Sequence, residues 1–335
     1  MPVYPLSFAD RHVPAVPLGC VDAARARLAE AREETYLAQI DAEYRAVLGA
    51  LLEAHMPFRI LNLGSAESAL ADALRAEGYP EFRLALPEPG SAYAYPRDLM
   101  VYLKGFGIAL VPEGWAAEDA LAGLAVECWP TPWAEGGRAL VSGDTMVVFR
   151  HPEKPAAPDQ ATLDRLRERG VRVVELPAGI FCTLDRDGDI TRVFHEHHID
   201  RAAGLARGPD SATHLLLAPG FRTGPLLSPL SKSASRDAVR RACDAADLAL
   251  HVLPDTAPPY AASLVQSDAG VIVLGAHDPD TVQAATEVAG AGQVVTTAVE
   301  LSHFPTFAGA GIHCLVTESP EFLAVAGGIP ETESP

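Results

Sequence analysis

The sequence predicts an α/β fold built from a repeated unit, and three observations support this class. A pattern of strand, strand, helix and strand recurs about five times after residue 56, with the first copy abbreviated. The chain has 335 residues, 48% of them hydrophobic, so it can bury a large core. One unit alone cannot bury both of its faces, so we expect the units to pack around a pseudo-symmetry axis.

The five copies are predicted from apolar runs for strands and from helical spacing of apolar residues for helices. The first copy has strands at 58–63 and 82–86 and a helix at 67–77; the second has strands at 99–103, 107–111 and 125–129 and a helix at 117–124. The third has strands at 138–141, 145–149 and 171–176 and a helix at 160–169. The fourth has strands at 213–218 and 248–252 and a helix at 234–245; the fifth has strands at 262–266, 271–274 and 293–297 and a helix at 278–289.

The residues before and after the repeats are expected to differ from them. Residues 1–19 are rich in proline and are predicted to be irregular. Apolar residues at helical spacing over 21–55 predict one or two amphipathic helices, which we interpret as an N-terminal extension or a helical dimer contact. The predicted organisation is therefore an extension at 1–55, a five-module domain at 56–322 and a C-terminal tail at 323–335.

Composition limits the function. The formal net charge is -18, which disfavours nucleic acid and anionic membranes and would attract a small cation, although an acidic surface also serves solubility alone. There is no apolar run of membrane-spanning length and no signal-peptide pattern at Met1. The five cysteines are scattered without CxxC spacing, which favours a reducing cytoplasm over disulfides or a cysteine-built zinc site.

Ligands in such arrangements bind on the axis, so residues of catalytic type are expected at the joints between units. Four joints carry them: Tyr95-Pro96-Arg97-Asp98, Trp133-Ala134-Glu135-Gly136-Gly137, His195-Glu196-His197-His198-Ile199-Asp200 and Gly309-Ala310-Gly311-Ile312-His313-Cys314. In the last joint, small residues leave room for a ligand beside Cys314. If the segment that follows is extended, as its apolar residues indicate, His313 points away from Cys314.

These four motifs, in this order, resemble the signatures of the guanidine-modifying pentein superfamily, which includes arginine and agmatine deiminases, arginine dihydrolases, dimethylarginine hydrolases and amidinotransferases. The resemblance covers roughly residues 56–320 and implies a fivefold αβ propeller. It places the nucleophile on Cys314, the general acid/base on His198 and the guanidinium-binding carboxylates on Asp98 and Asp200. Glu135 matches the glutamate that orients the histidine and the substrate. No metal or other cofactor is implied.

The chemistry of a guanidinium agrees with these residue types. The group is a flat cation, so two carboxylates can bind its N–H edges by charge-assisted hydrogen bonds and hold its carbon in place. A cysteine beside a bound cation can react as a thiolate. A histidine can then protonate the departing amine and activate water. We therefore expect a cytoplasmic hydrolase of the deiminase type, acting on free arginine or a close guanidino compound.

Departures from the family pattern concern the far end of the substrate. Ala310 stands where the family usually has a glycine, and Arg138 stands where arginine deiminases generally carry an acidic residue. The presence of Asp200 disfavours the dimethylarginine branch. A substrate carboxylate would need an arginine, for which Arg138 is the first choice; the other candidates are Arg97, Arg201 and Arg222.

Other interpretations stay open. Amidino transfer to an amine would use the same five residues, so the sequence does not separate it from hydrolysis. His195, His197, His198 and Asp200 could instead form the metal site of a metallohydrolase, but that would leave Cys314 and Glu135 unused. The segment Asp185–Asp189 begins like a calcium loop but lacks the later ligands, so a hairpin turn at Gly188 is preferred. A homo-oligomer is also left open.

Overall fold

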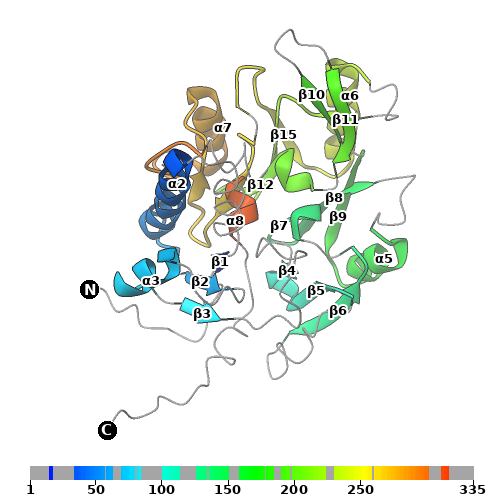
Figure 1. Cartoon of the computed structure of the whole chain (residues 1–335). Helices are drawn as coiled ribbons and strands as arrows, with labels where there is room; N and C mark the ends of the chain where they lie inside the picture. The colour runs from blue at the N-terminus through cyan, green and yellow to red at the C-terminus, as the bar shows by residue number, and fades with distance from the viewer. Residues whose placement is uncertain are drawn as a thin grey trace.

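The computed structural model describes residues 15–17, 34–56, 58–62, 69–79, 81–83, 100–113, 126–133, 136–150, 158–177, 179–184, 190–196, 198–223, 230–258, 260–301 and 311–316. The strands in these residues form six three-stranded sheets, combined with helices in a mixed α/β architecture (Figure 1). Among the described helices, none combines the length and the hydropathy needed to cross a bilayer.

Four of the sheets share one plan. The first two strands form an antiparallel hairpin, and the third strand is parallel to the second. The sheets are β4 (Val101–Leu103), β5 (Ile108–Pro112), β6 (Glu127–Thr131); β7 (Ala139–Ser142), β8 (Thr145–Arg150), β9 (Arg172–Pro177); β12 (Ala203–Arg207), β13 (Thr213–Leu217), β15 (Ala249–Val252); and β16 (Leu264–Gln266), β17 (Ile272–Leu274), β18 (Val294–Thr296).

A helix connects the second and third strands wherever that connection is described. These crossover helices are α5 (Gln160–Glu168), α6 (Lys232–Ala245) and α7 (Pro279–Ala289). Each begins at a residue whose side chain accepts a backbone N–H of the first turn: Asp159, Ser231 and Asp278. The predicted order of strand, strand, helix and strand is thus confirmed in these sheets, with helix bounds within two residues of those observed.

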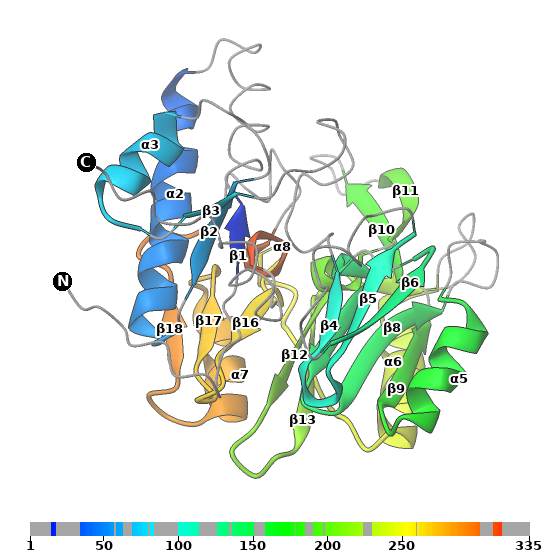
Figure 2. The same ribbon diagram turned by 90° about the horizontal axis from the view of Figure 1, so that it is seen from below.

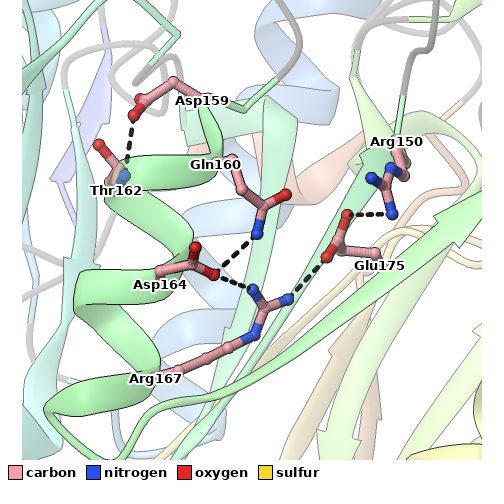
Figure 3. Close-up of polar contacts among 7 residues, drawn as sticks. All are labelled: Arg150, Asp159, Gln160, Thr162, Asp164, Arg167 and Glu175. Carbon is pink, nitrogen blue, oxygen red and sulfur yellow. Dashed lines mark hydrogen bonds and ion pairs between the residues drawn. The ribbon is translucent and has the colours of Figure 1, made fainter.

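One ion pair joins helix α5 to its own sheet, beside polar contacts within the helix (Figure 3). Asp159 accepts the N–H of Thr162 at 2.8 Å, and Arg167 contacts both Asp164 at 2.8 Å and Glu175 on β9 at 2.6 Å. Exposed pairs of this kind contribute at most about 1 kcal/mol each. They orient the helix on the sheet, whereas the apolar face of α5 supplies most of its stability.

The described elements before residue 56 pack against the rest of the fold, whereas the sequence predicts an irregular segment and a helical extension there. Strand β1 (Ala15–Pro17) pairs in parallel with β2 (Arg59–Asn62), which pairs with β3 (Glu81–Arg83) across α3 (Ala69–Ala76). The long helix α2 (Glu34–Glu53) buries Tyr44, Leu48 and Leu51 in one cluster with Val273 and Cys314. The helix prediction is confirmed over residues 34–53, and the helix shares a hydrophobic cluster with Cys314.

Two further elements were not predicted as they stand. Strand β12 (Ala203–Arg207) was missed because its small residues give a weak strand pattern, and pairing with β13 forms it. A sixth sheet is built from β10 (Gly179–Leu184), β11 (Ile190–Glu196) and β14 (Arg222–Thr223). Strands β10 and β11 pair in antiparallel fashion, as in a hairpin, and the predicted turn at Gly188 lies outside the described residues.

The first strands of neighbouring sheets lie side by side, in the order β4, β7, β12 and β16. An ion pair between Lys104, after β4, and Asp268, after β16, links the outer two of these sheets. The one-turn helix α8 (Ile312–Leu315) contacts β1 and β16 and lies near the centre of the molecule, with α2 and α7 on one side and α5 on the other (Figures 1 and 2). This placement brings Cys314 into contact with the joint that contains Asp200.

Candidate active site

Cys314 lies on α8 and is only 5% exposed. The segment was expected to be strand-like, but Ile312–Leu315 forms a single helical turn that begins at Gly311. A Cβ at position 311 would lie 2.3 Å from Oγ of Ser263, so only glycine permits this approach. Oγ of Ser263 accepts the backbone N–H of His313 at 3.1 Å, which holds the start of the turn.

Asp200 is completely buried in the short 3-10 helix η4 (Ile199–Arg201) and accepts hydrogen bonds from two residues of α8. The Sγ of Cys314 donates to Oδ2 at 3.2 Å, and Nδ1 of His313 lies 3.1 Å from the same oxygen. A carboxylate only accepts, so Nδ1 of His313 carries the proton in this contact. The expectation that His313 points away from Cys314 assumed an extended segment and is therefore wrong, because consecutive residues on a helical turn do not alternate between two faces.

His198 precedes η4 and stands on the other side of Asp200. Its Nδ1 lies 4.0 Å from Oδ1 of Asp200. Gly137, at the middle of the 3-10 helix η3 (Gly136–Arg138), packs directly on both side chains: a Cβ there would lie 2.4 Å from Nδ1 of His198 and 3.1 Å from Oδ1 of Asp200. The second glycine of the motif Glu135-Gly136-Gly137 is thus required for close contact between two joints.

Electrostatics keep Asp200 ionised. Burial by itself raises the pKa of Asp200, but the hydrogen bond and the charge of His313, together with His198 and the Cys314 thiol, hold it below the ordinary value of 3.8. Both donors bind Oδ2. Within the described part of the chain, the buried Oδ1 has no hydrogen-bond partner. A buried carboxylate oxygen without a donor is costly, so this atom is suited to accept an N–H from a ligand.

Two further residues beside the site were not predicted. Tyr260 has a φ of 64°, a conformation that costs an aromatic residue about 1–2 kcal/mol, and its Cβ lies beside Gly311. Its hydroxyl accepts from Nη2 of Arg201 at 2.6 Å. Ser263 supports α8, as described above. Tyr260 lies just before the predicted strand at 262–266 and Ser263 lies within it, and neither belongs to a motif that would have singled it out.

The predicted site residues divide into three groups. The structure brings together Cys314, His198 and Asp200 from two joints, and it places half-buried Arg138 at the end of η3, which contacts η4. His195 lies in β11, but its side chain is outside the described part. Also outside the described residues are Arg97, Asp98, Glu135 and His197. Among the side chains that are described, no group of three or more His, Cys, Asp or Glu residues could hold a metal ion.

Comparisons with known proteins now bear on the fold. No protein-family model matches the chain, and no curated protein matches it either. The solved structure of a candidate peptidyl-arginine deiminase superposes with a TM-score of 0.52 at 10% identity, covering 93% of this chain and 96% of that one. The chain has a pentein fold. The resemblance stated from the motifs is confirmed at this level.

Other solved structures of guanidino-modifying enzymes show weaker superposition. DDAH from Pseudomonas aeruginosa, solved in complex with citrulline, has a TM-score of 0.49 at 13% identity and covers 92% of this chain and 99% of its own. An agmatine deiminase candidate has a TM-score of 0.47 at 15% identity and covers 83% of this chain and 88% of its own. These pentein neighbours do not determine a reaction or a substrate for this chain.

Proposed function

We propose that this chain is a cysteine-dependent hydrolase of a guanidino compound, of the arginine or agmatine deiminase type. The observation that supports it most directly is the contact between Cys314 and Asp200, 114 residues apart in the sequence, beside His198. A thiol, an ionised carboxylate and an imidazole are the groups needed to bind a flat cation and attack its carbon.

Substrate binding would use the open oxygen of Asp200. A guanidinium N–H donated to Oδ1 would satisfy the buried atom that has no hydrogen-bond partner among the described residues, and the cation would offset the charge of the carboxylate. The predicted second carboxylate, Asp98, would bind the opposite N–H edge. If the substrate carries a carboxylate, Arg138 is the preferred partner, with Arg97 as an alternative.

In the first half of the reaction, the bound cation and a protonated His198 favour loss of the Cys314 proton to solvent, and the thiolate sulfur attacks the guanidinium carbon. In the substrate-free site this thiol donates to Asp200, so a thiolate would face a carboxylate until the cation binds. His198 donates a proton to the departing nitrogen. Ammonia is released, and a covalent S-alkylthiouronium remains on Cys314. Glu135 is proposed to orient His198 and the substrate.

In the second half, water replaces the sulfur. His198 takes a proton from water, the oxygen adds to the thiouronium carbon, and the bond to Cys314 breaks to release a ureido product and the thiol. Replacement of water by an amine would convert the same site into an amidinotransferase. The reaction needs no metal, whereas the alternative of a metal-dependent hydrolase would use His195, His197 and His198.

The fold supports this proposal through the placement of the joints. We propose that residues 56–322 form a fivefold propeller with the site on its axis, so that a small cationic substrate reaches Cys314 from the end where the joints meet. The first strands of four sheets lie side by side, and α8 contacts one of them, β16, which agrees with such an arrangement.

Incubation with arginine, agmatine and methylated arginines, each with and without an amine acceptor, tests the proposal. Release of ammonia with a ureido product is expected, and its loss in Cys314→Ser. Transfer of the amidino group to the acceptor would instead identify a transferase, and two ammonia per arginine with ornithine would identify a dihydrolase. Loss of activity in a chelator would favour the metal alternative. Normal turnover by Cys314→Ser would refute the mechanism.

A further inference from the structure

His313 contacts the proposed site but has no part in the reaction described above. Its Nδ1 lies 3.1 Å from Oδ2 of Asp200, and its backbone N–H is bound to Ser263 at 3.1 Å. The side chain is 12% exposed. The residue is therefore held at its backbone and at its ring, and Asp200 is the partner toward which the ring is directed.

His313 and Cys314 donate to the same oxygen of Asp200, and their roles differ once the thiol reacts. When Cys314 has lost its proton or formed a covalent bond through sulfur, it no longer donates to Oδ2. Among the described residues, Nδ1–H of His313 is then the donor that remains at Oδ2. A buried carboxylate that lost both donors would rotate or take up a proton, since burial penalises its charge.

We propose that His313 is a positioning residue that holds Asp200 by Oδ2, so that Oδ1 faces the guanidinium throughout the reaction. This inference rests on the proposed function, because it assigns Oδ1 to the substrate cation. It also agrees with the finding that Oδ1 has no described hydrogen-bond partner, since both donors of α8 bind the other oxygen, Oδ2.

A consequence is that His313 determines the lowest pH at which Asp200 still binds a cation. The titratable and charged groups described around Asp200 are His198 and Arg201 on its own segment, His313 and Cys314 on α8, and Arg138 at the end of η3. The hydrogen bond from His313 is the strongest of the contacts that lower the pKa of Asp200. Without this hydrogen bond, the remaining contacts offset less of the effect of burial on the carboxylate. The pKa of Asp200 therefore rises, and the carboxylate is protonated at a higher pH.

Two variants separate hydrogen bonding from packing. In His313→Asn, the amide nitrogen can occupy the place of Nδ1 and keep a donor to Asp200, whereas His313→Phe fills the space without a donor. His277→Asn is the matched control, because its ring contacts Thr297 at 3.4 Å. Thermal unfolding of all three variants shows whether each one folds.

The test measures alkylation of Cys314 by cationic 2-chloroacetamidine and by neutral iodoacetamide between about pH 4 and 8, located by peptide mass spectrometry. The ratio of the two rates reports cation binding by Asp200 without any turnover. For His313→Phe we expect this ratio to fall about 10- to 100-fold, with the decline beginning at a higher pH than in the natural chain. His313→Asn and His277→Asn should retain most of the ratio.

An unchanged ratio in folded His313→Phe would overturn the inference. An equal loss of the ratio in His313→Asn and His313→Phe, together with equally lowered stability, would also overturn it, because it would indicate a purely structural role. Failure of the proposed function has a different signature. In that case the natural chain would convert no guanidino compound in the turnover assay, whatever the labelling ratios of the variants.

Discussion

Gly137→Ala is the sharpest test that the joints around Asp200 form a working site. The added Cβ would lie 2.4 Å from Nδ1 and 2.9 Å from Cγ of His198, and 3.1 Å from Oδ1 of Asp200. Ordinary contact begins at 3.4 Å, so the imidazole has to move by about 1 Å. The ring is the group that must yield, because Asp200 is held by two donors from α8.

The expected effect on activity is large and the effect on stability moderate. A displacement of about 1 Å at a reacting group can cost about 100-fold in rate. Overpacking of a buried site typically costs about 1–3 kcal/mol of unfolding free energy. We therefore expect kcat/KM of Gly137→Ala to fall about 100-fold while the protein still folds.

The assay is ammonia release with the best guanidino substrate, combined with urea unfolding of the same preparations. Gly49→Ala is the matched control, because Gly49 is exposed on α2 and a Cβ there meets no atom within 4 Å. That change should leave activity intact and stabilise the helix by about 0.5–1 kcal/mol. Full activity of folded Gly137→Ala would refute the assignment of His198 and Asp200 to catalysis.

Further predictions concern single residues. Cys314→Ser should lower turnover at least about 1000-fold with substrate binding retained, as seen by calorimetry, and a matching loss of binding would contradict a purely nucleophilic role. Asp200→Asn should weaken substrate binding about 10- to 100-fold, again by calorimetry, since a charge-assisted hydrogen bond is lost; unchanged affinity would remove Asp200 from the binding site. Burial and the neighbouring His251 lower the pKa of His214 below 6.5, so this group stabilises the fold above that pH and the contribution is lost as the pH falls. His214→Asn should therefore make the unfolding free energy, measured in urea, less dependent on pH on the acidic side, and an unchanged slope would assign that dependence to other groups.

Much of the repeat could be predicted because its signals are local. Helices α5, α6 and α7 have helical spacing of apolar residues and a capping side chain at their start, so their bounds follow from a few neighbouring residues. Strands such as β8 contain continuous apolar runs that are buried on both faces. Strands β1 and β12 have no such runs, and their partners in the sheet, far along the chain, decide their conformation.

The candidate site divides in the same way. The residue types at the joints could be read from the sequence, since a carboxylate, a histidine and a cysteine were each expected from motif and chemistry. The direction of a side chain could not, because it depends on whether the backbone around Cys314 is extended or helical. The helical conformation of residues 312–315 directs the side chain of His313 toward Asp200.

The sequence by itself therefore determined the repeating unit, the joints and the identity of Cys314, His198 and Asp200 as site residues to be tested. Only the tertiary structure decided that two residues of α8 share Oδ2 of Asp200 and that Gly137 packs against His198. The physical reason is that periodicity and capping act over a few residues. The contacts of Asp200 with α8 and of Gly137 with His198 join segments more than 60 residues apart, which meet only in the folded chain.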